Sequence, residues 1–184
     1  MDIRECYDKL DALLAEHKLD EAETYLQLRI AAARREDEPG AELGFLNELV
    51  GIYRVQSRWQ DSYGVGEEAL ELARQMELNE SIYYATTLLN TATAYREAGK
   101  YDKAEEYYLQ ALPLMREIPE TEPYQMASLY NNLSLLYLDT GRTGEAMTCL
   151  REALPLISAL PDAQAETATT YTNLAQALFD AGQD

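Results

Sequence analysis

Apolar and small residues recur at spacings of three and four along most of this chain. In LLNTATAYREAGKYDKAEEYYLQALPL, residues 88–114, Leu88, Ala92 and Tyr95 follow this spacing and Gly99 interrupts it. The spacing is that of a helix that packs one face against a partner. Glycine adopts positive φ at little cost, which suits the end of a helix. Because the spacing resumes directly after the glycine, the stretch predicts two helices joined by a tight turn.

The same pattern returns 42 residues later in the chain. Residues 130–156, YNNLSLLYLDTGRTGEAMTCLREALPL, align with the first stretch so that Asn132 matches Asn90 and Gly141 matches Gly99. A weaker copy, LNELVGIYRVQSRWQDSYGVGEEALEL, comes before them, and partial copies stand near both ends. A period of about 20 to 50 residues is typical of arrays of stacked units. The repeat therefore predicts a solenoid.

The periodicity predicts nine helices and no sheet. The expected helices span residues 3–16, 19–35, 40–56, 59–76, 80–98, 101–117, 122–140, 143–159 and 163–181. Ala92 and Ala104 are short side chains that allow two antiparallel helices to approach closely. Pro113 and Pro155 each lack a backbone donor, so we expect a bend there followed by one more helical turn.

These repeated residues resemble the tetratricopeptide repeat (TPR) family, in particular its longer form found in kinesin light chains. The positions that carry the resemblance are Leu88, Ala92, Tyr95, Gly99, Tyr101, Ala104, Tyr108 and Ala111. The resemblance implies an all-α, right-handed α-solenoid of stacked antiparallel helix hairpins, as a single domain over residues 1–184. The expected repeats cover 3–35, 43–76, 83–118 and 125–160, followed by a half repeat over 163–184.

The first two copies depart from the family pattern. His17 and Ser57 stand where the turn usually has glycine, and Arg29 stands where alanine is usual. Gly64 and Gly66 lie inside an expected helix, where each costs about 1 kcal/mol relative to alanine. We expect these two copies to pack less well than the later ones.

The formal net charge of −18 opposes binding to nucleic acids and to anionic membranes. The sequence has no apolar run that is long enough to span a bilayer, and its first residues, MDIRECYDKLDALL, lack the apolar core of a signal peptide. The two cysteines, Cys6 and Cys149, show no metal-binding spacing and fit a reducing compartment. We therefore expect a cytoplasmic protein.

Candidate chemistry is sparse, so we expect neither an enzyme nor a bound metal or cofactor. His17 is the only histidine, and it stands at a turn. Cys149 lies beside an apolar stripe, which favours packing over reactivity. The stretch YGVGEE lacks the preceding strand and third glycine of a nucleotide-binding loop. Nothing here supplies a nucleophile, base or metal at a defined distance.

The family resemblance also implies a binding groove. In TPR proteins, ligand-contacting residues lie on the first helix of each hairpin, on the face opposite its packing stripe. Carried over by position, the expected groove residues are Asn47, Glu48, Arg54, Thr86, Asn90, Thr93, Arg96, Glu97, Asn131, Asn132, Leu135, Asp139, Asn173 and Gln176.

A row of asparagines stands out in this set. Asn90, Asn132 and Asn173 recur with the repeat, and an amide offers both donors and an acceptor to the backbone of an extended peptide. The alternative is that each asparagine bonds a neighbouring helix and only packs the solenoid. No lysine falls in the set, so a clamp for a terminal carboxylate is not expected. Glu48 and Asp139 favour neutral or basic peptides.

We therefore expect a non-catalytic scaffold that captures an extended protein segment or peptide in its concave groove. One alternative is a ligand-responsive regulatory sensor resembling bacterial peptide-responsive TPR regulators, and another is a structural assembly module. The half repeat lacks a second helix to cover its apolar stripe. An uncovered stripe implies a capping role, a missing downstream segment or association with another copy, and of these we expect a homodimer that pairs through Tyr171, Leu174 and Leu178.

Overall fold

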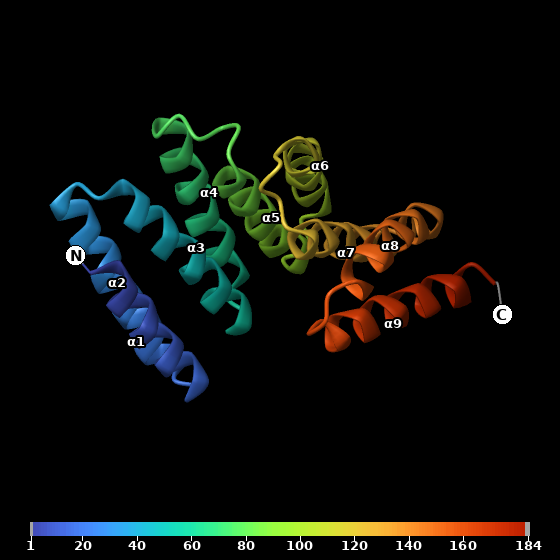
Figure 1. The fold of residues 1–184 in the computed structure, drawn as a ribbon, viewed down its shortest axis with the longest axis horizontal. Helices are drawn as coiled ribbons and strands as arrows, with labels where there is room; N and C mark the ends of the chain where they lie inside the picture. The colour runs from blue at the N-terminus through green and yellow to red at the C-terminus, as the bar shows by residue number, and fades with distance from the viewer. Residues whose placement is uncertain (1, 183–184) are drawn as a thin grey trace. The chain divides into compact units, whose positions relative to one another are not determined.

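The computed structural model describes residues 2–182, and within them the chain forms nine α-helices and no strand. The helices are α1 (Ile3–Ala15), α2 (Leu19–Glu36), α3 (Pro39–Val55), α4 (Trp59–Gln75), α5 (Ile82–Glu97), α6 (Tyr101–Glu117), α7 (Pro123–Asp139), α8 (Thr143–Ser158) and α9 (Gln164–Asp180) (Figure 1). Every bound lies within two residues of its predicted position, so the expected helices are confirmed.

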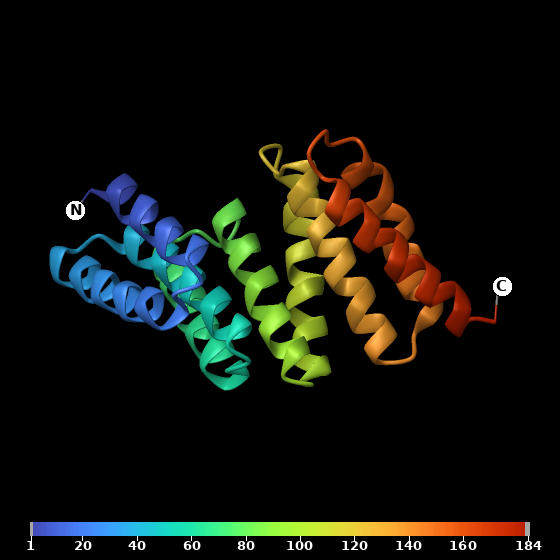
Figure 2. The ribbon, with the colours of Figure 1, turned by 90° about the horizontal axis from the view of Figure 1, so that it is seen from below.

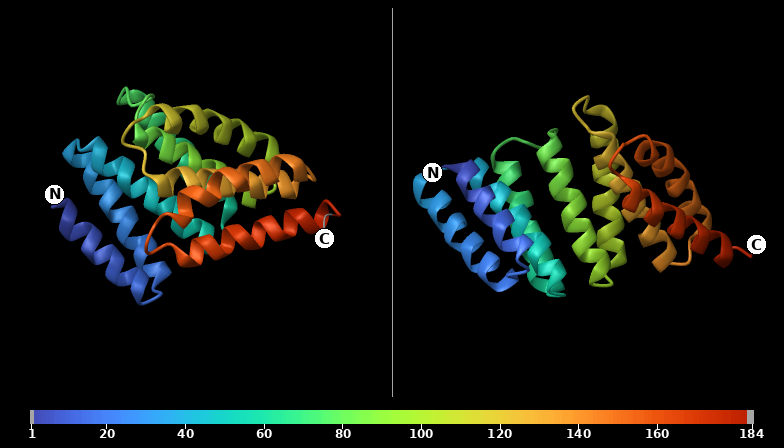
Figure 3. Two further views of the ribbon diagram at one scale, coloured as in Figure 1. Left: turned by 45° about the vertical axis from the view of Figure 1, so that its right-hand side comes forward. Right: turned by 60° about the horizontal axis from the view of Figure 1, so that its bottom comes forward.

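The chain divides into two compact units, one on each side of the boundary between Asn79 and Glu80. In the first unit, α1 to α4 pack in chain order, each against the next (Figure 3). In the second unit, α5 to α9 do the same, and the first helices of its hairpins, α5, α7 and α9, also contact one another in turn (Figure 2). Each unit is thus a stack of antiparallel hairpins. The expected single domain stays a prediction.

Each hairpin turns at the same repeat position through a residue with positive φ. This residue is His17 (57°), Ser57 (57°), Gly99 (72°) and Gly141 (73°) in the four complete hairpins. The N–H of Gly99 donates a hydrogen bond to the carbonyl oxygen of Arg96, with an N···O distance of 2.9 Å, and this bond closes the end of α5. A left-handed residue at this position reverses the chain and satisfies helix-end carbonyls. The predicted turn positions are therefore confirmed.

Small residues lie where the two helices of a hairpin cross. Ala92 and Ala104 are both fully buried, which allows α5 and α6 to approach closely. Tyr108 is fully buried beside them, and its hydroxyl donates a hydrogen bond to Thr93 Oγ1 at 3.0 Å. A buried hydroxyl needs such a partner, because leaving it unpaired costs about 1–3 kcal/mol. The hairpin core is therefore held by both packing and a polar pair.

Both helix-internal prolines are accommodated at exposed positions. Pro113 lies within α6, which continues to Glu117, and Pro155 lies within α8, which continues to Ser158. Because the prolines face solvent, water can reach the backbone carbonyls that they leave without an N–H donor. The additional helical turn after each proline, which the sequence predicts, is confirmed.

An arginine at the start of a second helix links consecutive hairpins in the first unit. Arg58 is the N-cap residue of α4, and its guanidinium carbon lies 4.2 Å from the ring centroid of Tyr53 at the end of α3. Its Nη1 donates to Oε2 of Glu23 on α2 at 2.6 Å. We call this arrangement of cation, ring and carboxylate a tyrosine clamp.

A second tyrosine clamp occurs two repeats later, in the second unit. Arg142 is the N-cap residue of α8, its guanidinium carbon lies 4.3 Å from the Tyr137 ring centroid, and its Nη1 donates to Glu105 Oε1 of α6 at 2.7 Å. In both clamps the cation bridges the second helices of two neighbouring hairpins. A cation–π contact and an ion pair thus act on the same side chain.

None of the described helices is both long and apolar enough to cross a membrane.

Candidate functional site

The structure brings four of the predicted groove residues together in one pocket between α7 and α9. Asn131, Asn132 and Leu135 enter it from α7, and Asn173 enters it from α9. The cavity has a volume of about 210 Å³. Its full lining is Tyr124, Ser128, Asn131, Asn132, Leu135, Ile157, Glu166, Thr169 and Asn173. We call it the α7–α9 pocket.

Helical spacing explains why these side chains share a pocket. Ser128, Asn132 and Leu135 are separated by four and three residues, which places them on one face of α7. Thr169 and Asn173, four residues apart, lie on one face of α9. Because α7 and α9 contact each other as the first helices of neighbouring hairpins, the two faces meet.

The hydrogen bonds of the pocket asparagines are partly internal. Asn131 Nδ2 donates to Thr170 Oγ1 at 2.9 Å, which ties α7 to α9. Asn132 Nδ2 donates to the Ser128 carbonyl of its own helix at 2.9 Å. These bonds favour a packing role for both amide nitrogens. Asn131 Oδ1, in contrast, is buried without a hydrogen-bond partner among residues 2–182.

Arg96, one of the predicted groove residues, joins α5 to α7 through an ion pair. Its Nη1 donates to Asp139 Oδ2 at 2.7 Å, and Glu97 Oε1 lies 3.8 Å from its Nη2. The Arg96 side chain is 15% exposed. Burial by itself lowers the Arg96 pKa, but the hydrogen bond to Asp139 and the nearby charges outweigh burial and raise it. Arg96, Glu97 and Asp139, all three predicted groove residues, therefore form a cluster of ion pairs within the chain.

Thr93 belongs to the hairpin core and not to the groove, which corrects its predicted place. Its side chain donates to the Leu89 carbonyl at 2.8 Å and accepts from the Tyr108 hydroxyl at 3.0 Å. Thr93 is only 3% exposed. The reason is its position on α5, where it faces the second helix of the same hairpin. Thr86 and Asn90, on the same helix, are half-buried.

Gln176 lies on α9 outside the pocket lining, and the structure pairs it within its own helix. Its Nε2 donates to Asp180 Oδ1 at 2.7 Å. The side chain is exposed. It therefore lies on the surface of α9 without being part of the α7–α9 pocket.

Three predicted groove residues, Asn47, Glu48 and Arg54, lie on α3 in the first unit. Asn47 Nδ2 donates to the carbonyl of Leu43 at 3.0 Å, and Arg54 is half-buried. Glu48 is exposed to solvent, but partial desolvation by the surrounding protein, followed by the negative charge of Asp11 on α1, raises the pKa of its carboxyl. Two neighbouring carboxyl groups make this face of the first unit attractive to cations.

The pocket lining also contains five residues outside the expected groove set, namely Tyr124, Ser128, Ile157, Glu166 and Thr169. Tyr124 stands four residues before Ser128 on the same face of α7, so helical spacing alone would have included it. Glu166 similarly stands three residues before Thr169 on α9. Ile157 comes from the end of α8, and only the packing of that helix places it here.

Other candidate chemistry of the chain has a structural explanation. No group of three or more His, Cys, Asp or Glu residues that could hold a metal ion occurs among residues 2–182. Cys149 is buried, and this burial raises the pKa of its thiol to about 11, so little reactive thiolate forms at neutral pH. His17 is exposed at its turn.

Comparison with known proteins gives a consistent picture of the repeats. A family model described as tetratricopeptide repeat matches residues 41–117 and 125–184. No curated protein matches the sequence.

Two solved structures illustrate the similarity of fold. The crystal structure of BtubC (BKLC) from P. vanneervenii is 25% identical, with a TM-score of 0.85 over 98% of this chain and 73% of that chain. A Podosopora anserina protein described as a kinesin light chain with nearly identical TPR-like repeats is 19% identical, with a TM-score of 0.77 over 100% of this chain and 90% of that chain. The fold is thus an all-α, TPR-like solenoid of helix hairpins.

Proposed function

The chain belongs to the tetratricopeptide repeat family, whose members are typically non-catalytic protein-interaction scaffolds, and from this premise we propose that it captures an extended segment of a partner protein. The proposed site is the α7–α9 pocket together with the adjoining faces of the first helices in the second unit. One observation carries the proposal. Asn131, Asn132 and Asn173 line a single cavity, and Asn131 presents a buried acceptor without a partner among the described residues.

The chemistry of the pocket suits the backbone of a peptide. A buried acceptor without a donor costs about 1–3 kcal/mol, and a peptide N–H that reaches Asn131 Oδ1 would recover part of this cost. Backbone bonding of this kind depends little on the peptide sequence. Leu135 and Ile157 add apolar contacts, while Glu166 and the net charge of −18 favour a neutral or basic segment.

The size of the pocket also supports a peptide. Small-molecule and cofactor pockets usually enclose about 300–1,000 Å³. The α7–α9 pocket, with about 210 Å³, is smaller than this range. Its volume fits an anchor for one side chain of an extended segment better than a site for a whole cofactor.

A peptide-selection experiment tests the proposal. A random peptide pool would be passed over the immobilised chain, and the affinities of enriched peptides would be measured by fluorescence polarisation. We expect the enriched peptides to be neutral or basic. We expect the combined variant Asn131→Ala, Asn132→Ala and Asn173→Ala to bind them about tenfold or more weakly than the original chain does. Asn79→Ala, an exposed loop residue of the first unit, is the matched control. Groove capture would be contradicted by enrichment of acidic peptides. It would also be contradicted if the triple asparagine variant bound the peptides as tightly as the Asn79→Ala control does.

A specific observation also favours a second role, the pairing of two copies through α9. Tyr171 of α9 is 54% exposed, whereas Tyr130, at the equivalent repeat position of α7, is 6% exposed. Phe179 is 71% exposed, and Leu174 and Leu178 are half-buried. We propose that a second copy covers this face. Light scattering should show a dimer that Tyr171→Arg disrupts, and a strictly monomeric chain at high concentration would reject the pairing.

A further inference from the structure

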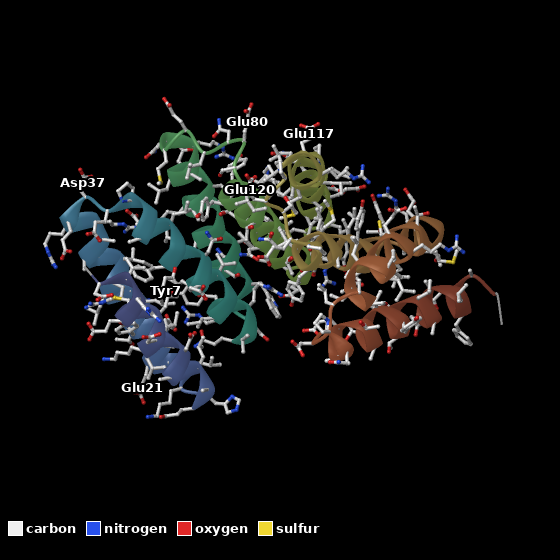
Figure 4. The ribbon with its side chains drawn as sticks, viewed as in Figure 1. Tyr7, Glu21, Asp37, Glu80, Glu117 and Glu120 are labelled. Carbon is white, nitrogen blue, oxygen red and sulfur yellow. The ribbon has the colours of Figure 1, made fainter. Side chains whose placement is uncertain are left out.

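A second cavity, of about 770 Å³, lies at one end of the α5–α6 hairpin. The turn at Gly99 is at the other end of this hairpin. It is enclosed by the start of α5, the end of α6 and the loop that follows α6. Three glutamates, Glu80, Glu117 and Glu120, line it, and Figure 4 shows them labelled at this end of the unit. The ring of Tyr83, which is 67% exposed, also lines the cavity. We call it the Tyr83 cavity.

The floor of the Tyr83 cavity is apolar. Leu114 and Ile118 contribute to it, and both are half-buried. An exposed aromatic ring beside an apolar floor is the composition of a contact surface for another molecule. The charge around it then decides which molecule fits.

The charge of the cavity is negative, and no cationic side chain in the described part of the chain pairs with it. Among residues 2–182, no lysine, arginine or histidine lies in ion-pair contact with Glu80, Glu117 or Glu120. These three carboxylates therefore have capacity for a cation that no residue among 2–182 supplies.

Elsewhere in this protein, a tyrosine ring and a glutamate together hold a cationic side chain. In the two tyrosine clamps, a guanidinium lies over a tyrosine ring and pairs with a glutamate. A third example, within α6, places Lys103 Nζ 4.4 Å from the Tyr107 ring centroid and 3.0 Å from Glu106 Oε2. The Tyr83 cavity offers a ring and carboxylates in the same neighbourhood but no cation.

We propose that the Tyr83 cavity docks a basic segment of a partner protein, with an arginine or lysine side chain held between the Tyr83 ring and the glutamates. The aliphatic part of such a side chain would cover the apolar floor, since long cationic side chains bury their stems and keep their charge at the polar rim. The ring and the carboxylates would act on the same charge.

The helix ends at the cavity are compatible with a cation. The C-terminus of α6, at Glu117, carries partial negative charge and attracts a cation. The N-terminus of α5 has the opposite effect, but the Ser81 side chain accepts a hydrogen bond from the Tyr84 N–H at 3.2 Å and so satisfies one of its donors. The three carboxylates therefore dominate the local charge.

This docking site is separate from the α7–α9 pocket, because the two cavities share no lining residue. The proposal therefore goes beyond peptide capture in the groove. Either site can fail its own test while the other stands.

The test uses the full chain and a fluorescently labelled peptide of alternating arginine and glycine residues, with alanine replacing arginine in a neutral version. We expect Tyr83→Leu, Glu117→Gln and Glu120→Gln each to weaken binding of the basic peptide about two- to fivefold, and the combined variant about tenfold or more. Binding should also weaken as salt increases.

Two matched controls separate this site from other sources of binding. Asp102→Asn removes one charge from the far end of α6, and Leu109→Ala removes an exposed apolar side chain from the middle of the same helix, outside both cavities. We expect neither to change the affinity for the basic peptide, and circular dichroism would verify that every variant folds. The proposal is overturned if the combined Tyr83 cavity variant binds as tightly as the original chain. It is also overturned if a control weakens binding as much as the cavity variants do.

Discussion

His17 and Ser57 hold the backbone in the same left-handed conformation that Gly99 and Gly141 adopt in the later hairpins. For a residue with a Cβ, this conformation costs about 1–2 kcal/mol. The fold imposes it anyway, because the turn reverses the chain and closes the first helix of each hairpin. At the residue scale, the first two hairpins therefore carry backbone strain that the later ones avoid.

Glycine at this turn should give a measurably higher free energy of unfolding than a residue with a Cβ does. We expect Ser57→Gly to raise the free energy of unfolding by about 1 kcal/mol, and Gly141→Ala to lower it by a similar amount. A Cβ at Gly141 would meet no atom within 4 Å, so the loss would report backbone strain alone. Urea denaturation measures both changes. A neutral Gly141→Ala variant would contradict this reading of the turn.

The thiol of Cys149 should react only when the structure opens. Its pKa of about 11 lies above the usual value for cysteine, so deprotonation in the folded state is postponed to pH values near 11. At pH 8, only about 0.1% of the thiol is then ionised. We expect iodoacetamide to label Cys149 slowly in buffer and quickly in urea. Mass spectrometry of a Cys6→Ser variant would follow this site alone, and rapid labelling of the folded protein at pH 8 would be inconsistent with the burial.

The tyrosine clamps act at the scale of the helices. Each one fixes the start of a second helix to the second helix of the preceding hairpin and to the end of its own first helix. Arg58 does so in the first unit and Arg142 in the second. Each clamp therefore adds a polar link between two neighbouring hairpins.

Breaking one clamp should loosen its hairpin junction. We expect Arg142→Met to lower the melting temperature, because it removes the ion pair to Glu105 and the cation over Tyr137 while it keeps an unbranched side chain. The loss should shrink at high salt, which screens the ion pair. A double-mutant cycle with Glu105→Gln isolates the pair, and Arg151→Met, exposed on the same helix, is the control. Equal losses for both arginines would show that the clamp has no special role.

At the scale of the whole molecule, the chain consists of two compact units, and each contains fully buried side chains. Fully buried side chains such as Phe45 and Leu46 lie in the first unit, and Tyr108 and Leu129 lie in the second. In repeat proteins, stability is approximately a sum over units and the interfaces between neighbours. Each unit should therefore have folding stability of its own.

A fragment of residues 80–184 tests this expectation. We expect it to be helical and to unfold in a cooperative transition, because its helices α5 to α9 keep the contacts that they make with one another. Circular dichroism and calorimetry provide the measurement. A fragment without cooperative unfolding would instead support the single domain over 1–184 that the sequence predicts.

Sequence reasoning located the helices more accurately than the candidate site. The helix bounds follow from a local spacing of apolar residues and from turn residues such as Gly99, so neighbouring residues suffice to define them. The candidate site depends on which face of each helix is covered. Thr93 was expected in the groove, but it faces Tyr108 in the core. Arg96 was expected in the groove, and its side chain pairs with Asp139, 43 residues away.

The amino-acid sequence by itself determined the all-α hairpin repeat, its period, the position of every turn and the acidic character of the protein. These properties are local or additive, so each can be read from short stretches of the chain or from its composition. Only the tertiary structure decided which polar side chains remain for a partner. That depends on contacts between distant residues, as Asn131 with Thr170 and the three uncompensated glutamates around Tyr83 illustrate.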